Sequence, residues 1–185
     1  MNQQDPTQPI EPFLKNFFAS LDAQYNSTNS NFLNVESYAT QFGSNLKQNS
    51  AIIINGSPII PNLQQNENSK LIFQKKWLNT PISFHQLTSF DCHLIPGTNT
   101  FIINFSGKVK FDQSGRNRLG ENADLIQEPA TIVKSNRPIW GSWFGINGNV
   151  VVDNNFGSTT SGGGEIINSL DYRFTYVPKD TTLNI

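Results

Sequence analysis

The strongest constraint on the fold is the alternation of apolar and polar residues in TFIINFSGKVKFD, residues 100–112. Apolar residues occupy odd-numbered positions, and most even-numbered positions are polar; the apolar set is Phe101, Ile103, Phe105, Val109 and Phe111. Successive side chains of a strand point to opposite faces of a sheet. The pattern therefore predicts a half-buried antiparallel strand.

Three further stretches show the same period, at residues 82–95, 140–153 and 165–177. Their apolar positions predict one continuous core face, which contains Ile82, Phe84, Phe90, Cys92, Leu94, Trp140, Phe144, Ile146, Val150, Val152, Ile166, Leu170, Tyr172, Phe174 and Tyr176. Trp140 and Trp143 are an odd number of residues apart, so they are expected on opposite faces. This register places Trp140 in the core and Trp143 outside.

The first part of the chain has helical periodicity instead. Apolar residues recur at helical spacing in residues 10–21, at Ile10, Phe13, Leu14, Phe17, Phe18 and Leu21, which predicts an amphipathic helix. A short second helix is expected at 35–45 and a third at 64–79, with a tight hairpin around Asn55-Gly56 between them. Three helices followed by four long strands predict an α+β domain over residues 1–185, with the helices on the concave face of a curved antiparallel sheet.

Composition narrows the class of function. The net charge of −1 gives no general attraction to nucleic acid or to anionic membranes. Cys92 is the only cysteine, which excludes internal disulfides and multi-cysteine zinc sites. The chain shows neither a secretory signal nor a run of about 20 apolar residues. We therefore expect no membrane insertion and no cofactor.

Two histidines and an aspartate raise the question of a metal or acid–base site. His85, Asp91 and His93 lie in one predicted strand, opposite its apolar positions. In that register they point away from the core and form a solvated or partner-facing surface, although a β-bulge would reverse part of the strand.

Residues 113–136 show no clear helical or strand periodicity of apolar residues, so a long loop is expected. A loop of this length in a compact domain is either functional or disordered. It is locally basic, with acidic residues interspersed; the basic residues in and beside it are Arg116, Arg118, Lys134 and Arg137. A solvated mixed-charge loop and an accessory contact with protein or ribonucleoprotein both fit this composition.

The polar face of the predicted sheet is interrupted by apolar side chains next to isolated charges. Aromatic residues and arginine carry much of the binding energy in protein interfaces. We therefore predict a partner interface that contains Trp143, Leu87, Ile102, Asn104, Lys108, Val151, Ile167, Asp171 and Arg173.

Two long stretches resemble a known family. HLIPGTNTFIINFSGKVKFDQSGRNRLGENAD and RPIWGSWFGINGNVVVDNNF, with the ending YVPKDTTLNI, are similar to the fungal messenger-RNA transport regulators. These are the small nuclear transport factor 2-like subunits of the general mRNA export receptor. The order of helices, hairpin and strands fits this nuclear transport factor 2-like fold.

The resemblance implies a function without catalysis. Family members pair sheet to sheet with a larger subunit, and the heterodimer carries messenger ribonucleoprotein, and in fungi large ribosomal subunits, through nuclear pores by contacting phenylalanine-glycine nucleoporins. The chain is then expected in the nucleus and at the pore, shuttling to the cytoplasm. Arg173 matches the position of an arginine that pairs with an acidic residue of the large subunit.

An enzyme is the alternative, because the same fold hosts small-molecule isomerases and dehydratases. Such enzymes place polar catalytic groups in a pocket between the sheet and the helices. The predicted interior of this chain is aromatic, which favours a filled core.

Overall fold

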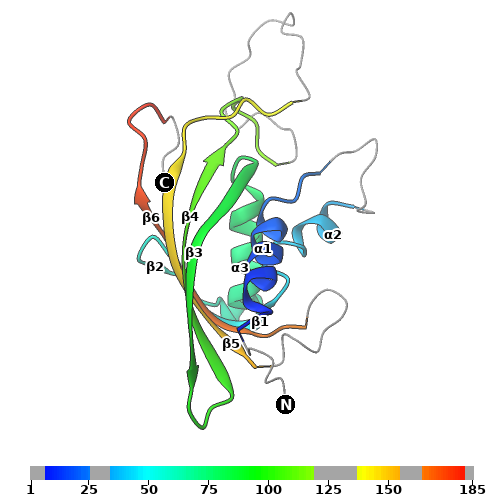
Figure 1. The fold of residues 1–185 in the computed structure, drawn as a ribbon. Helices are drawn as coiled ribbons and strands as arrows, with labels where there is room; N and C mark the ends of the chain where they lie inside the picture. Colours follow the sequence, from blue (N-terminus) through cyan, green and yellow to red (C-terminus); the bar gives the residue numbers. More distant parts are fainter. Residues whose placement is uncertain (1–6, 26–33, 119–136, 155–163, 182–185) are drawn as a thin grey trace, which may run out of the picture.

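The chain folds into a curved sheet with helices on one side, as seen in a computed structural model that describes residues 7–25, 34–118, 137–154 and 164–181 (Figure 1). The elements, in chain order, are α1 (Ile10–Leu21), α2 (Val35–Ala39), β1 (Leu46–Ile54), β2 (Ser57–Pro58), the 3-10 turn η1 (Leu63–Gln65), α3 (Ser69–Leu78), β3 (Ser83–Ile95), β4 (Thr100–Phe111), β5 (Phe144–Asp153) and β6 (Ile167–Tyr176). The α+β prediction is confirmed.

The sheet order is β2-β1-β6-β5-β4-β3. Strands β3 to β6 are antiparallel as expected, but β1 pairs parallel with β6, so the sheet is mixed. The sequence predicts only the second half of β1, since its first residues are polar. The first half of β1, which the sequence does not predict, is stabilised by contacts with β6, a strand distant in sequence. For example, the Ser50 hydroxyl donates a hydrogen bond to the Ile167 carbonyl oxygen at 2.7 Å.

Helices α1 and α3 lie on the concave face of the sheet, and the short α2 packs against α3 (Figure 1). The stripe of α1 is buried as predicted, including Leu14 and Phe17. The second helix is much shorter than expected. The third helix begins later than predicted, because Asn68 caps it by accepting a hydrogen bond from the Leu71 amide at 2.9 Å. No helix in the described ranges is long and apolar enough to cross a membrane.

A bulge in β3 reverses the predicted faces of its first half. The pairing with β4 shifts between Leu87 and Ser89. His85 therefore points into the core with its side chain fully buried, while Phe84 points outward and is 47% exposed. Leu87 packs against the core instead of lying on the outer face. These three predictions were wrong because one extra residue changes which side chains share a face.

Two more predicted faces are wrong for related reasons. Ile167 is fully buried, because the pairing between β5 and β6 shifts next to it and turns it inward. Trp140 lies outside β5, where it bridges to Asp112, and is 37% exposed. Residues 141–143 are not part of β5, so the alternation of faces along that strand does not extend back to Trp140. Trp140 is therefore not a core residue.

Three other predicted core residues are exposed at the ends of the sheet. Phe90 and Leu94 lie on the long hairpin of β3 and β4, which extends past the helices (Figure 1), and Tyr176 is the last residue of β6. Phe90 and Leu94 keep the core-side register of β3, but no helix covers them there. Tyr176 instead pairs with Gly145, beside the register shift between Gly145 and Ile146.

Candidate partner interface on the outer sheet face

The outer face, defined here as the sheet face opposite the helices, carries most of the predicted interface residues. Pairing of Ile102 with Val151 places two apolar side chains next to each other at one end. In the middle, Asn149 donates to the Asn104 side-chain oxygen at 2.7 Å. On the neighbouring rung, Asn147 donates to the Ser106 hydroxyl at 3.1 Å. These bonds fix the orientation of the amide groups across β4 and β5.

An aromatic corner, formed by Phe84, Lys110, Trp140 and Trp143, occupies the other end of the outer face. The Lys110 ammonium lies 5.3, 5.0 and 4.9 Å from the ring centroids of Phe84, Trp140 and Trp143. Cations over aromatic faces are attracted by the ring quadrupole. The lysine therefore holds the Phe84 ring of β3 and the two tryptophan rings of the segment before β5 in one cluster.

Asp112 positions the segment that carries the tryptophans. Its buried carboxylate accepts hydrogen bonds from the Ser114 amide at 3.0 Å and from the Ile139 amide at 2.8 Å. The Gly141 amide then donates to the Phe111 carbonyl oxygen at 3.0 Å. The chain leaving β4 and the chain entering β5 are thus tied together beside the corner.

Arg173 and Asp171 form an exposed ion pair on β6. The Arg173 Nη2 donates to Asp171 Oδ2 at 2.6 Å and its Nε to Oδ1 at 2.9 Å. The hydrogen bond to Asp171 raises the pKa of the Arg173 guanidinium. A partner carboxylate that pairs with Arg173 would have to share it with Asp171.

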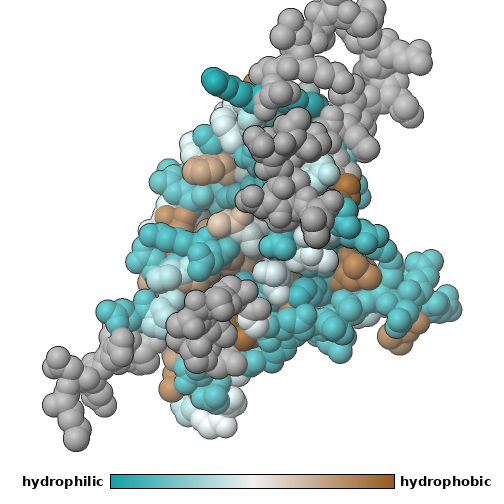
Figure 2. Space-filling view, turned by 90° about the vertical axis from the view of Figure 1, so that its right-hand side faces the viewer, coloured by the Kyte–Doolittle hydropathy of each residue, from teal (hydrophilic) through white to brown (hydrophobic). Residues whose placement is uncertain are grey.

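The opposite side of the molecule looks different. With the helices facing the viewer, the surface is mainly hydrophilic and its apolar residues are scattered (Figure 2). Scattered apolar residues are normal on any protein surface.

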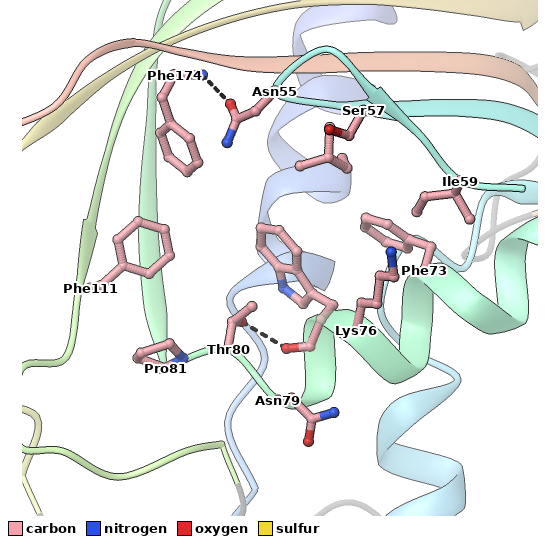
Figure 3. A pocket seen from close by; sticks show the side chains of 12 residues that line it. Asn55, Ser57, Ile59, Phe73, Lys76, Asn79, Thr80, Pro81, Phe111 and Phe174 are labelled. Atoms are coloured by element: carbon pink, nitrogen blue, oxygen red, sulfur yellow. Dashed lines mark hydrogen bonds between the residues drawn. The ribbon is translucent and has the colours of Figure 1, made fainter. Parts of the chain in front are cut away.

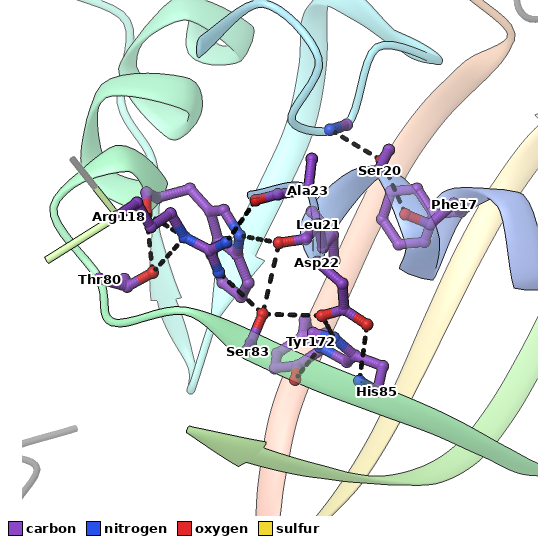
Figure 4. Close-up of polar contacts among 12 residues, drawn as sticks. Phe17, Ser20, Leu21, Asp22, Ala23, Thr80, Ser83, His85, Arg118 and Tyr172 are labelled. Atoms are coloured by element: carbon purple, nitrogen blue, oxygen red, sulfur yellow. Dashed lines mark hydrogen bonds and ion pairs between the residues drawn. The ribbon is translucent and has the colours of Figure 1, made fainter. Parts of the chain in front are cut away.

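Arg118, predicted as part of an exposed basic loop, is instead buried beneath the helices at 1% exposure (Figure 4). It donates hydrogen bonds to the Trp77 carbonyl at 3.2 Å, the Thr80 hydroxyl at 3.2 Å, the Ala23 carbonyl at 3.3 Å and the Ser83 hydroxyl at 2.7 Å. Burial lowers the pKa of the Arg118 guanidinium, and the nearby Tyr38 acts in the opposite direction by raising that pKa. The prediction was wrong because Arg118 anchors the beginning of the loop.

The network continues to a buried aspartate–histidine–tyrosine chain (Figure 4). Asp22 accepts from the Ser83 hydroxyl at 2.8 Å, from the His85 amide at 2.7 Å and from His85 Nδ1 at 2.5 Å. His85 Nε2 lies 3.0 Å from the Tyr172 hydroxyl. This order assigns the His85 proton to Nδ1 and makes the Tyr172 hydroxyl the donor to Nε2.

Burial and hydrogen bonding set the ionisation of this chain. Burial acts to raise the pKa of Asp22, but the hydrogen bonds from His85 and Ser83 outweigh it and hold that pKa below its usual value. Burial raises the pKa of Tyr172 well above its usual value. Asp22 is therefore an anion and Tyr172 a neutral donor at pH 7.

Comparison with known proteins identifies the family. Residues 3–185 match the family described as nuclear pore RNA shuttling protein Mtr2. The mRNA transport regulator MTR2 of Candida albicans is 65% identical over 188 residues, covering all of both chains. The chain belongs to the Mtr2 family.

Solved structures agree with the Mtr2 assignment and with the fold. A crystal structure of the Candida albicans Mtr2–Mex67 M domain complex contains a chain 66% identical to this one, with a TM-score of 0.82, and the match covers 96% of this chain and 100% of that chain. A nuclear transport factor 2-like protein from Salmonella enterica is 11% identical, with a TM-score of 0.50 over 96% of this chain and 94% of its own. The nuclear transport factor 2-like fold is confirmed, and membership of the Mtr2 family confirms the expectation of a chain that is not an enzyme.

Among the residues predicted for the partner surface of this Mtr2 family member, the outer face brings together Trp143, Ile102, Asn104, Lys108, Val151, Asp171 and Arg173. Leu87 and Ile167 belong to the core side. Sequence reasoning missed Phe84, Lys110 and Trp140. Gly141 directly after Trp140 was a usable signal, since glycine inside an apparent strand often marks its interruption.

The remaining polar candidates fall into three groups. Asp91 and His93 are exposed and pair with each other at 2.9 Å, and the described residues contain no cluster able to hold a metal. Arg116 lies near Arg137, to whose carbonyl oxygen it donates at 3.4 Å. Lys134 and residues 119–136 of the predicted loop lie outside the described residues.

Proposed function

We propose that this chain is the small, non-enzymatic subunit of a heterodimeric mRNA export receptor and binds its large subunit through the outer sheet face. The support from comparison is the 65% identical mRNA transport regulator and the related complex of Mtr2 with the Mex67 M domain. The structural observation that carries the proposal is the aromatic corner, in which Phe84 and Trp140 remain exposed while Lys110 orders them.

The energetic argument rests on preorganisation. Binding usually costs free energy because flexible side chains must be ordered at the interface. In the aromatic corner the rings already contact each other: Phe84 lies 6.2 Å from Trp140 and 6.0 Å from Trp143, centroid to centroid. A partner that covers them gains apolar burial without first ordering them.

Calorimetric titration with the M domain of a Mex67-type large subunit tests the proposal. We expect a 1:1 complex that Trp143→Ala weakens by about 2 kcal/mol or more, since central interface aromatics often contribute that much. Lys15→Ala on the exposed side of α1 is the control and should leave affinity unchanged. A chain that stays monomeric with the M domain present, or equal loss from both variants, contradicts the proposal.

The finer part of the proposal concerns transport. The heterodimer would carry messenger ribonucleoprotein, and large ribosomal subunits, through nuclear pores by contacting phenylalanine-glycine nucleoporins. This chain would accordingly reside in the nucleus and at the pore and shuttle to the cytoplasm. The support is the family description as a nuclear pore RNA shuttling protein.

We further propose that the loop at residues 113–136 contacts cargo. Arg118 is excluded from this contact because its side chain is buried. Arg116 and Arg137 lie at the base of the loop, whereas Arg118 is buried inside the fold. Deletion of residues 119–136 should therefore spare heterodimer formation and reduce export of one cargo class in cells. Unchanged export of both mRNA and large ribosomal subunits would reject this role.

A further inference from the structure

A pocket of about 440 Å³ opens between α3, the hairpin of β1 and β2, and the concave face of the sheet (Figure 3). It lies on the opposite side of the sheet from the proposed interface. Its walls are mainly apolar, and its lining residues include Ile54, Ile59, Phe73, Trp77, Phe111 and Phe174. This volume and this composition are typical of small-molecule sites.

The aromatic walls of the pocket are packed against one another. Phe73 stacks on Trp77 with 5.6 Å between centroids, and Phe111 lies 6.0 Å from Phe174. Phe73, Trp77 and Phe111 are each less than 8% exposed, so solvent reaches little of each wall. The accessible space therefore suits a slim apolar group.

The hairpin places an amide at the pocket. Asn55 and Gly56 both have positive φ, 51° and 79°, as a tight turn of this kind requires. The Asn55 Oδ1 accepts a hydrogen bond from the Phe174 amide at 2.9 Å, which assigns the Asn55 NH₂ group to the other side. Figure 3 shows that NH₂ group directed toward the pocket, where no described residue accepts from it.

The other side chains at the pocket add donors but no negative charge. Lys76 lines it from α3, and within the described part of the chain its ammonium has no ion-pair partner. Ser57 adds a hydroxyl without a partner among those residues. Among the residues that the structure describes, none with a carboxylate lines the pocket. An apolar cavity with an unpaired cation and free donors is complementary to an anion with an apolar tail.

We propose that this pocket binds a small amphipathic carboxylate, with the apolar tail between the aromatic walls and the carboxylate at Lys76 and Asn55. This binding site goes beyond the export function and requires no chemistry. Charge complementarity favours an anionic occupant, because the Lys76 ammonium at the pocket has no ion-pair partner among the described residues.

Titration of the full-length chain with octanoate and with its neutral analogue octanamide tests the proposal. We expect 1:1 binding of octanoate that is about tenfold tighter than that of octanamide, the difference expected of a charge-assisted hydrogen bond. The Asn55 side-chain amide resonances should shift on binding. Lys76→Gln should remove the tenfold preference and leave octanamide binding unchanged.

Lys75→Gln is the matched control. Lys75 is the neighbour of Lys76 on α3, but it forms an ion pair with Glu67 and does not line the pocket. Its replacement should preserve the preference for octanoate. Ile59→Phe, checked for native folding by circular dichroism, should weaken both ligands by filling the pocket.

Three outcomes would overturn the proposal. The first is a folded wild-type chain that binds no octanoate at millimolar concentration. The second is an octanoate preference that survives Lys76→Gln. The third is octanoate binding that Ile59→Phe leaves unchanged, which would locate the ligand elsewhere. Binding of the M domain should be unaffected by both lysine variants, so this test is independent of the heterodimer proposal.

Discussion

Replacement of Asp22 by alanine should lower the free energy of unfolding by about 2 to 4 kcal/mol. The carboxylate accepts from the His85 amide at 2.7 Å and from His85 Nδ1 at 2.5 Å, and the His85 side chain is fully buried. Each buried donor without an acceptor costs about 1 to 3 kcal/mol. The Ser83 hydroxyl adds little, because it can turn to the Leu21 carbonyl oxygen 3.3 Å away.

Urea denaturation at several pH values measures this loss and its origin. Because the pKa of Asp22 is depressed in the folded state, its contribution is complete above the unfolded value of about 3.9 and is lost as the pH falls through the folded value. The gap between wild type and Asp22→Ala should therefore be constant from pH 7 to about pH 5 and narrow toward pH 3. Asp91→Ala is the control and should leave the midpoint nearly unchanged, because the Asp91 side chain is 69% exposed. A gap below about 1 kcal/mol, or one that stays constant down to pH 3, would refute the role assigned to the carboxylate.

Three other predictions concern individual residues. Ile167→Ala should lower the unfolding free energy by about 2 to 4 kcal/mol in urea, as core truncations do, whereas a surface isoleucine would show almost no effect. Arg118→Ala should cost about 3 kcal/mol by the same measurement because it empties a buried site, while Arg116→Ala should leave the midpoint nearly unchanged; equal effects would contradict the anchor. Burial and the nearby Asp91 carboxylate raise the pKa of the Cys92 thiol to about 11, so alkylation by iodoacetamide should be slow at pH 8 and still accelerate at pH 10. A rate that levels off near pH 8.5 would disprove that shift.

The elements with an uninterrupted period were predictable from sequence. The apolar stripe of α1 and the alternation of β4 both agree with the structure. In each element the helical or strand period continues without a bulge, so the spacing of residues alone fixes which side chains are buried. Predicted faces failed where the period is broken, at the bulge near Leu87, at the register shift beside Ile167 and just before the start of β5, near Trp140. A shift of one residue exchanges core and surface.

The buried position of Arg118 had no signal in the sequence. Its hydrogen-bond acceptors belong to Ala23, Trp77, Thr80 and Ser83, which are far from it in the chain. A loop arginine followed by further polar residues has the composition of an exposed segment. Only the folded arrangement supplies enough acceptors to make burial of that charge favourable.

The position of β6 in the sheet has a consequence for biosynthesis. The last strand of the chain lies between β1 and β5, so it joins two groups of strands made earlier. Until β6 has emerged from the ribosome, β1 has only the two-residue strand β2 as a neighbour. One edge of β5 is also unpaired during that time. Unpaired strand edges in incomplete chains favour aggregation. A chain that stops before Ile167 would therefore leave β1 and β5 unjoined, each with an open edge.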